Sequence, residues 1–205
     1  VKFLAENEYN NLINEYKIRD KWEKRSFLSK TEEDKKNRYL CIPIKNRSIE
    51  KYIDPYSSMW QKRYYQMLFN NGDSNYFKKQ VCLNYMEGLE WVMNYYTIGC
   101  IDWRWSYNYN YPPLLNDLFR FIPRFDSKMI KDNTNKPVSR KVQLSYVLPP
   151  ESLTLIPDIG NKLQDKFPHF YDESPNMVWA FCKYIWETHL DLPHIDLEEL
   201  EEFVN

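Results

Sequence analysis

Large apolar side chains recur at three- and four-residue spacing along most of this chain, and that spacing predicts helices. In residues 75–96 the apolar side chains cover more than one face, so we expect this helix to be central and buried on most sides. Twelve prolines interrupt the pattern. The sequence predicts a mainly α-helical fold with long ordered loops and a few short strands. Helices are expected within 3–37 and over 59–69, 75–96, 114–122, 137–147, 157–167 and 197–204.

For three stretches the pattern indicates the secondary structure less clearly. The charged run 29–38 favours a mobile linker over a solvated helix end, and 39–44 favours an extended piece. In 102–113 aromatic rings alternate with other residues, which is compatible with either a strand or a packed irregular loop. We therefore divide the chain into an N-terminal helical segment with a charged linker (1–51) and a helical domain (52–205).

Scarcity of glycine excludes the common phosphate-binding loops. The chain has only four glycines, and neither G-x-G-x-x-G nor G-x-x-x-x-G-K-[ST] can be written with them. A Rossmann or P-loop nucleotide site is therefore excluded. The four glycines are Gly72, Gly88, Gly99 and Gly160.

Neither a catalytic residue nor a metal ligand is predicted. The acidic runs at 32–34 and 198–202 are typical of solvated helix faces, and for Asp191, His194 and Asp196 loop structure is favoured over metal binding. There is no G-x-S-x-G motif for a nucleophilic serine. The four cysteines form no C-x-x-C pair, which disfavours a zinc finger or a disulfide framework.

The segment 103–111 holds two tryptophans, three tyrosines and one arginine. Rings in such a segment either fill the space between helices or form a stacking surface for single-stranded nucleic acid, with a basic group beside them. The formal net charge of −1 argues against a broad phosphate-binding surface. The candidate substrate-binding residues are Trp103, Arg104, Trp105, Tyr107, Tyr109 and Asn110.

This part of the chain resembles the middle conserved region of the XRN 5′-to-3′ exoribonucleases. The run from Tyr85 to Trp105 follows the family pattern Y-x-x-G-x-x-W-x-x-x-Y-Y-x-x-G-x-x-x-W-x-W without a gap. In the family order, the resemblance covers residues 52–200. Flanking matches are Trp60, Lys62, Tyr64–Tyr65, Pro137, Gln143–Leu144, Val147–Pro149, Trp186–Glu187 and Pro193–Asp196; departures are Asn108, Asn110, Pro112, Asn116 and Val138.

The resemblance implies part of an enzyme that hydrolyses 5′-monophosphorylated RNA, with Mg²⁺ bound by a preceding N-terminal catalytic region. That region would be present in cis or as a separate subunit, because its motifs are not found in this sequence. Residues 52–205 would brace the catalytic domain and restrict or stack single-stranded RNA, with Trp103 and Trp105 at the W-x-W positions. The alternative is a non-catalytic structural or RNA-binding module, for example a subunit of a viral assembly.

Location follows from what the sequence lacks. No run of eighteen apolar residues occurs, so neither a membrane span nor a secretion signal is expected. We expect the cytoplasm, with the nucleus, or a virion or viral factory, as alternatives.

Overall fold

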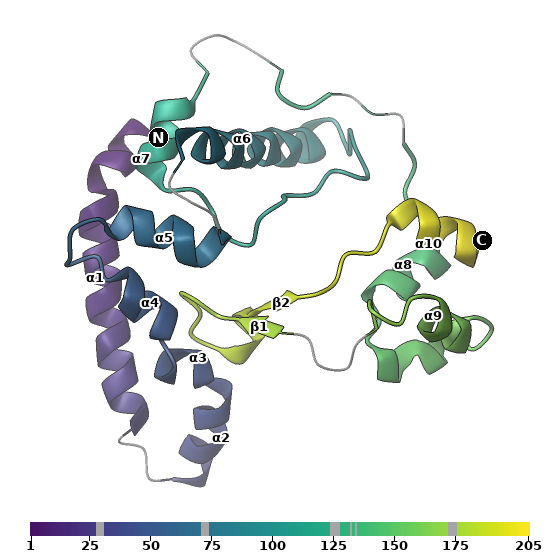
Figure 1. The fold of residues 1–205 in the computed structure, drawn as a ribbon, viewed down its shortest axis with the longest axis horizontal. Helices are drawn as coiled ribbons and strands as arrows, with labels where there is room; N and C mark the ends of the chain where they lie inside the picture. Colours follow the sequence, from purple (N-terminus) through teal and green to yellow (C-terminus); the bar gives the residue numbers. More distant parts are fainter. Residues whose placement is uncertain (28–30, 71–73, 124–127, 132, 134, 172–175) are drawn as a thin grey trace. The chain divides into compact units, whose positions relative to one another are not determined.

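The structure, a computed structural model, describes residues 1–27, 31–70, 74–123, 128–131, 133, 135–171 and 176–205. The chain forms two compact units (Figure 1). Unit 1 comprises Val1–Thr134 and Trp179–Thr188, and unit 2 comprises Asn135–Val178 and His189–Asn205. Helices dominate the described residues of both units, which confirms the mainly α-helical prediction. Both sides of position 51 lie in unit 1, and the division of the chain there stays a prediction.

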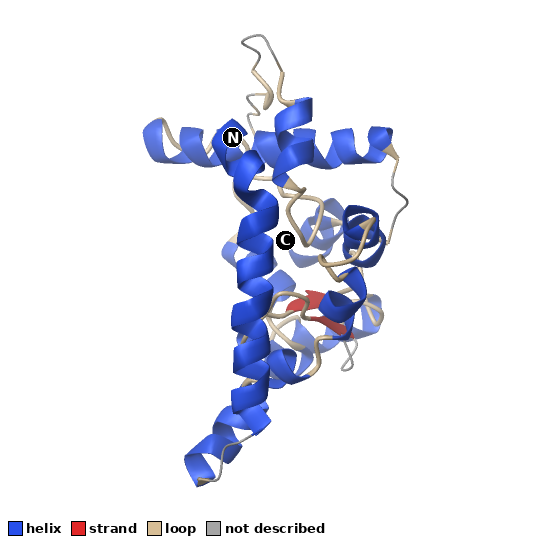
Figure 2. Ribbon diagram, turned by 90° about the vertical axis from the view of Figure 1, so that its left-hand side faces the viewer, coloured by secondary structure: helices blue, strands red, loops and turns tan. Residues whose placement is uncertain are grey.

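In unit 1, the long helix α1 provides the surface on which the shorter helices assemble. It contacts α3 and α7, while α7 also packs on α6 and α4 packs on α5. In the view of Figure 2, α6 runs across the direction of α1 near the N-terminal end of α1, and α7 packs on both helices. The elements are α1 (Lys2–Phe27), α2 (Glu32–Leu40), α3 (Ile42–Lys45), α4 (Ser48–Ile53), α5 (Trp60–Phe69), α6 (Asn75–Thr97), α7 (Leu115–Phe121) and the 3₁₀ helix η2 (Ile185–Glu187).

Unit 2 is built from short helices around an aliphatic core. Its elements are α8 (Arg140–Val147), the 3₁₀ helix η1 (Pro150–Leu155), α9 (Gly160–Lys166), β1 (Asn176–Val178), β2 (His189–Asp191) and α10 (Leu197–Val204). The two strands pair antiparallel with Met177 opposite Leu190. The buried core residues are Val142, Leu153, Ile156, Leu163, Phe167, Tyr171, Ile195, Leu200 and Val204.

The linker predicted over 29–38 is wrong from residue 32 onward, because α2 occupies Glu32–Leu40. An ion pair between Lys35 and Glu32, one helical turn apart, supports this helix. The extended piece predicted over 39–44 is also wrong, because α3 begins at Ile42. Pro43 suits its first turn and Ile44 is buried. Residues 28–30 lie outside the described part of the chain.

Helix α6 begins and ends as its sequence indicates. The Ser74 side chain accepts a hydrogen bond from the Phe77 amide at the start, and Gly99 follows the end with φ 108°. Burial on most sides, however, is a wrong prediction: the buried positions of α6 are Val81, Cys82 and Met86. Although α1 and α6 are long, no described helix is apolar enough over a sufficient length to cross a membrane.

Candidate functional site

The aromatic segment lies along α6 as an irregular loop, which settles the alternative left open by its alternating pattern. Tyr107 packs edge-on against Tyr85 of α6, with ring centroids 5.8 Å apart. Tyr109 packs edge-on between Phe69 of α5 and Phe77 of α6 at 5.6 and 5.9 Å. No described residue between 103 and 111 is in a strand. From Trp105 to Tyr111 the alternation arises because one side of an extended loop faces the helices and the other faces solvent, whereas Trp103 departs from it and is exposed.

Trp105 belongs to the packed side. Its ring is stacked on Trp91 of α6 at 5.9 Å, and Trp91 is in turn stacked on Tyr95 at 5.3 Å. A Cβ atom added at Gly88 would lie 2.6 Å from Cη2 of Trp105. The glycine therefore leaves the space in which this indole sits against the helix, and Trp105 is a structural part of the site.

Trp103 lies on the open side, with 51% of its surface exposed. The backbone on either side of it is held in place: Trp91 Nε1 donates to the carbonyl oxygen of Asp102 (2.8 Å), and the Arg104 amide donates to the Asp102 carboxylate (2.7 Å). Arg104 itself is half-buried. The sequence pattern could not separate the two tryptophans, but the structure gives them different environments.

The tyrosine hydroxyls of the segment are neutral at ordinary pH. Burial raises the pKa of Tyr107 and Tyr109 above 10.0, and chiefly burial raises that of Tyr111 to about 12. Tyr107 donates its hydroxyl proton to the carbonyl oxygen of Tyr111 (2.8 Å). The Tyr107 hydroxyl is thus a donor that fixes the loop, and the raised pKa values make all three phenols unsuited to act as bases.

The two asparagines of the segment face outward. The Asn108 amide donates to the side-chain oxygen of Asn84 on α6 (2.9 Å), which ties this turn of the loop to the helix. Asn110 is exposed. Of the six candidate residues, Trp103 and Asn110 are therefore open to solvent, while Arg104, Trp105, Tyr107 and Tyr109 are partly covered.

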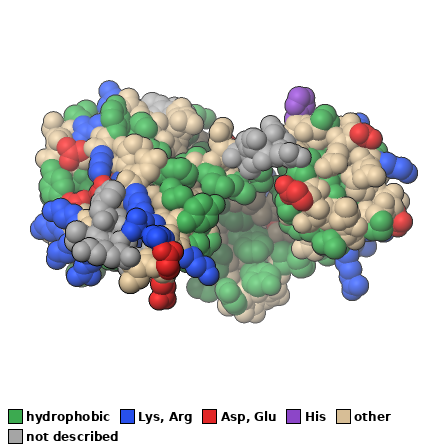
Figure 3. Space-filling model, turned by 90° about the horizontal axis from the view of Figure 1, so that it is seen from below, with side chains coloured by type: hydrophobic (Ala, Val, Ile, Leu, Met, Phe, Trp, Pro, Cys, Tyr) green, Lys and Arg blue, Asp and Glu red, His purple; other side chains and the backbone are tan. Residues whose placement is uncertain are grey.

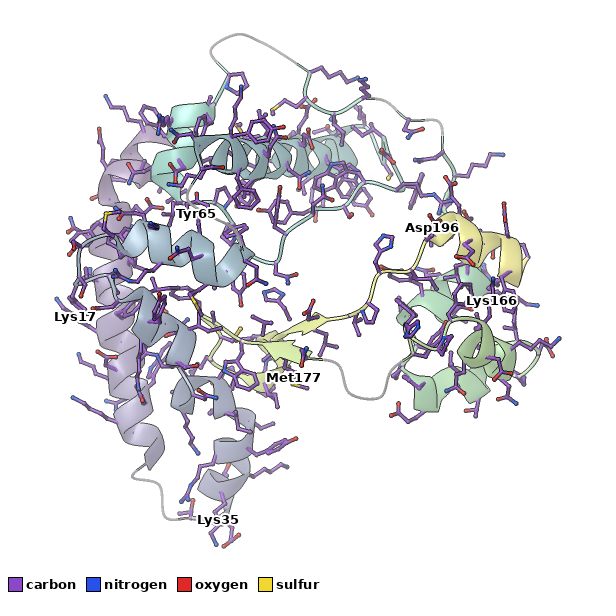
Figure 4. All side chains as sticks on the ribbon, viewed as in Figure 1. Lys17, Lys35, Tyr65, Lys166, Met177 and Asp196 are labelled. Atoms are coloured by element: carbon purple, nitrogen blue, oxygen red, sulfur yellow. The ribbon has the colours of Figure 1, made fainter. Side chains whose placement is uncertain are left out.

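Two tyrosines of α5 anchor the end of the segment, a role that helical periodicity alone could not assign. Tyr64 donates to the carbonyl oxygen of Pro112 (2.9 Å). Tyr65, labelled in Figure 4, donates to Asp117 of α7 (2.9 Å) and accepts from the Leu114 amide (3.2 Å). Burial and the neighbouring carboxylate raise the pKa of Tyr65, so its proton stays in place.

A cavity of about 540 Å³ opens beside this anchor, between α1 and the loop. Its walls come from five parts of unit 1 that are far apart in the chain, so no local sequence signal could have revealed it. Aromatic rings and the rim carboxylates of Glu8 and Glu15 contribute to it. The rings are Tyr64, Tyr85, Tyr111 and Phe181.

The described residues hold no group of three or more His, Cys, Asp or Glu side chains that could bind a metal ion. Asp196, one of the acids weighed for this role, caps α10 instead. Its carboxylate accepts from the amides of Glu198 (2.8 Å) and Glu199 (3.2 Å).

Known proteins are similar in sequence to this chain over most of its length. 5′-3′ exoribonuclease 2 of Gallus gallus is 32% identical over 156 residues, which cover 74% of this chain and 16% of that protein. The 5′-3′ exoribonuclease 2 homolog of Caenorhabditis elegans is 34% identical over 146 residues, or 69% of this chain and 15% of that protein. 5′-3′ exoribonuclease 2 of Arabidopsis thaliana is 29% identical over 150 residues, which cover 70% of this chain and 14% of that protein.

The chain thus spans about one sixth of the length of these curated relatives. The model of the family described as the Xrn1 helical domain matches residues 6–205. This match extends the resemblance seen in 52–200 into α1, whose residues pack on α7 and α3 in unit 1. With both its helical architecture and nearly its whole length accounted for, the chain belongs to the Xrn1 helical domain family.

Proposed function

We propose that this chain is part of a 5′-to-3′ exoribonuclease acting on 5′-monophosphorylated RNA, in which it braces the catalytic region and stacks single-stranded substrate. Family membership and the names of the relatives support the reaction class. The surfaces of unit 1 support the two roles within it.

The exposed ring of Trp103 is the observation that carries the stacking role. Asp102 and Trp105, on either side of it, are held on α6 by a hydrogen bond and a ring stack, so the backbone that carries the indole is fixed. A partly exposed aromatic ring on a fixed backbone can stack a base whatever the base is, because every base has a π face. Arg104 adjoins it and supplies a positive charge.

The C-terminal half of α6 supports the bracing role. Leu89, Val92, Met93 and Tyr96 follow the i, i+3, i+4, i+7 spacing of one helix face, and all four are exposed, Tyr96 to 81%. The helix face that is buried at Cys82 and Met86 thus continues as an exposed apolar stripe. Contiguous exposed apolar surface of this kind is typical of protein interfaces, and we assign this stripe to the catalytic region.

Mg²⁺ is the cofactor that this reaction class implies. The described residues do not fit such an ion, because they lack a cluster of three or more acidic or histidine side chains. No step of the reaction is therefore assigned to this chain's own residues. Its contribution in the proposal is to hold and orient RNA.

The test is degradation of 5′-monophosphorylated single-stranded RNA by the full native polypeptide with Mg²⁺, using 5′-hydroxyl RNA as the control. We expect stepwise loss of the first RNA and survival of the second. Trp103→Ala should weaken binding of the single strand by about 1 to 3 kcal/mol, whereas Trp103→Phe should largely retain it.

Two outcomes would contradict parts of the proposal. If the native polypeptide binds single strands but digests neither RNA, the enzyme hypothesis is rejected and the hypothesis of a non-catalytic module is retained. Unchanged affinity in Trp103→Ala removes the stacking role of this ring. Tyr76→Ala, which truncates another exposed ring at the other end of α6, is the matched control and should bind as the unaltered chain does.

A further inference from the structure

The loop 179–188 of unit 1 contributes to a column in which one lysine lies between two aromatic rings and a third ring stacks at the end. The Lys183 ammonium lies 4.4 Å from the ring centroid of Trp22 on α1 and 4.7 Å from that of Tyr184. Tyr184 is stacked on Trp186 at 4.5 Å with an interplanar angle of 11°. Trp186 ends the column with 63% of its surface exposed, so the ring face opposite Tyr184 is open.

A buried ionic network holds this loop on the helices. Arg19 of α1 donates to the carbonyl oxygens of Phe181 (2.5 Å) and Cys182 (3.1 Å). Glu50 of α4 accepts from the Phe181 amide (2.8 Å). At the other end of the loop, the Glu187 carboxylate accepts from the amides of Lys183 and Tyr184 (2.6 and 3.2 Å). The column is therefore fixed before any ligand arrives.

Near the end of α1 the two acidic side chains, Asp20 and Glu23, are paired with a buried arginine, although half of the Asp20 side-chain surface is exposed, whereas the basic side chains are exposed. Asp20 and Glu23 both pair with the buried guanidinium of Arg47 (2.7 and 3.2 Å). Their carboxylates are thus engaged with a charge inside unit 1. The basic residues Lys21, Lys24 and Arg25 of the same turns are exposed.

The neighbouring helices carry further charged residues: α2 has three basic and three acidic residues, and α3 adds the positive charge of Lys45. Helix α2 packs against η2, which contains Trp186. Lys45 of α3 lies close enough to Arg38 of α2 that its pKa is lowered, first by partial burial and then by that charge. Figure 3 shows many lysine and arginine side chains on unit 1 in the view from below, with a few acidic side chains beside them.

We propose that the open face of Trp186, backed by Tyr184 and Lys183 and flanked by the basic residues of α1, α2 and α3, is a second binding site for single-stranded nucleic acid. One base stacks on the indole, and the phosphates beside it contact the lysine and arginine side chains. Rings and positive charges in one place are the combination by which proteins hold single strands without reading sequence. This site is on different elements from Trp103, and its existence does not depend on the proposed function.

The test uses the full chain and 5′-fluorescein-labelled oligouridylate of about ten nucleotides, with EDTA present, followed by fluorescence anisotropy. Trp186→Ala should raise the Kd about tenfold, and Trp186→Phe should stay close to the unaltered chain. The double variant Lys21→Gln, Lys24→Gln should lower the slope of log Kd against log salt concentration by about 1 to 2. Tyr76→Ala, which truncates an exposed ring on α6, is the control and should leave the Kd unchanged.

The inference is overturned if the unaltered chain does not bind the oligonucleotide, or if Trp186→Ala binds it as tightly as the unaltered chain. The latter result would assign the ring to contacts with another protein. If Trp103→Ala weakens binding of the oligonucleotide and Trp186→Ala does not, the second site is rejected and the proposed function is retained. If only Trp186→Ala weakens binding, the second site is retained and the stacking role of Trp103 is rejected.

Discussion

The two units of this chain stabilise themselves with different kinds of side chain. The core of unit 2 is mostly aliphatic, with Leu163 and Leu200 at its centre. Unit 2 also buries the hydrogen-bonded Tyr171, whereas unit 1 buries several such tyrosines together with an Arg–Glu network around Glu50. All seven tryptophans of the chain also lie in unit 1.

This difference has a physical meaning for function. Aliphatic packing depends on volume and tolerates small shifts, whereas hydrogen-bonded rings and buried charges fix direction as well as position. Unit 1 presents Trp103 and Trp186, and each of these rings is supported by such directional contacts. The unit with the fixed polar interior is therefore the one that carries the two proposed RNA-binding surfaces.

Alkaline pH should produce the largest difference in stability between the two units. Burial is the main cause that raises the pKa of Tyr16, Tyr64, Tyr65 and Tyr111 above 10.0 in unit 1. Below pH 10 these phenols are neutral in both folded and unfolded chains, so stability is unaffected. Above it the unfolded chain loses the protons that the folded chain keeps, and stability falls by up to about 1.4 kcal/mol per pH unit for each tyrosine.

Urea unfolding between about pH 9 and about pH 11 checks this expectation. Tryptophan fluorescence reports unit 1, because all seven tryptophans are there, and far-ultraviolet circular dichroism reports both units. Unit 2 contains Tyr171, whose pKa is raised to about 12 by burial. If both probes lose stability equally over this range, the contrast between the units is wrong.

Removing the carboxylate of Glu50 should have the next largest effect. This side chain is 1% exposed, and it lies 2.5 Å from Nε of Arg47 and 3.5 Å from Nη1 of Arg19. Glu50→Ala leaves two buried guanidinium groups without it, and we expect unit 1 to lose about 3 to 5 kcal/mol. Urea unfolding followed by tryptophan fluorescence measures the loss. Glu6→Ala, in an exposed pair with Lys2 at 3.9 Å, is the control and should change stability by less than about 1 kcal/mol.

In unit 2, Leu163→Ala should cost about 2 to 5 kcal/mol, because it removes a fully buried side chain from an aliphatic core. Native-state hydrogen exchange of α8, α9 and α10 measures this, with the exposed Leu155→Ala as a neutral control. Tryptophan emission of the folded chain should not change. A changed emission spectrum would mean that the interior of unit 1 depends on the core of unit 2.

The smallest effects compare one glycine from each unit. A Cβ added at Gly160 of unit 2 would lie 2.4 Å from the carbonyl oxygen of Leu153, so Gly160→Ala must move backbone and should cost about 1 to 3 kcal/mol. At Gly88 of unit 1 the obstacle is the end of the Trp105 ring, and alanine favours the helix by about 1 kcal/mol. We expect a smaller net loss for Gly88→Ala, with a shift in tryptophan emission. A larger loss there than at Gly160, measured by urea unfolding, would show that Trp105 cannot move.

Elements with their own local signals could be predicted from the sequence. Helix α10 matches the predicted range 197–204, because Asp196 caps it and its apolar residues keep helical spacing. Helix α6 was predicted to within one residue of its end, where Gly99 stops it. A few short strands were predicted, but the positions of β1 and β2 were not, since strands of three residues are too short for a periodic signal.

The candidate site was only partly predictable for the same reason. The sequence pointed to the segment 103–111, but which of Trp103 and Trp105 faces solvent depends on the space beside Gly88 and the ring of Trp91. The column at Trp186 and the network at Glu50 depend on contacts between residues more than a hundred positions apart. Such contacts leave no trace in local spacing.

The discontinuity of unit 1 sets the order in which it can be completed during synthesis. Arg19 donates to carbonyl groups 162 and 163 residues later in the chain, and Glu50 accepts from an amide 131 residues later. A nascent chain leaves the ribosome from its N-terminus, so α1 and α4 emerge long before these partners exist. Most of unit 2 is translated in the interval, and unit 1 closes only after the ribosome has released the loop that carries Trp186. Its last step of folding and the formation of the Trp186 surface are therefore the same event.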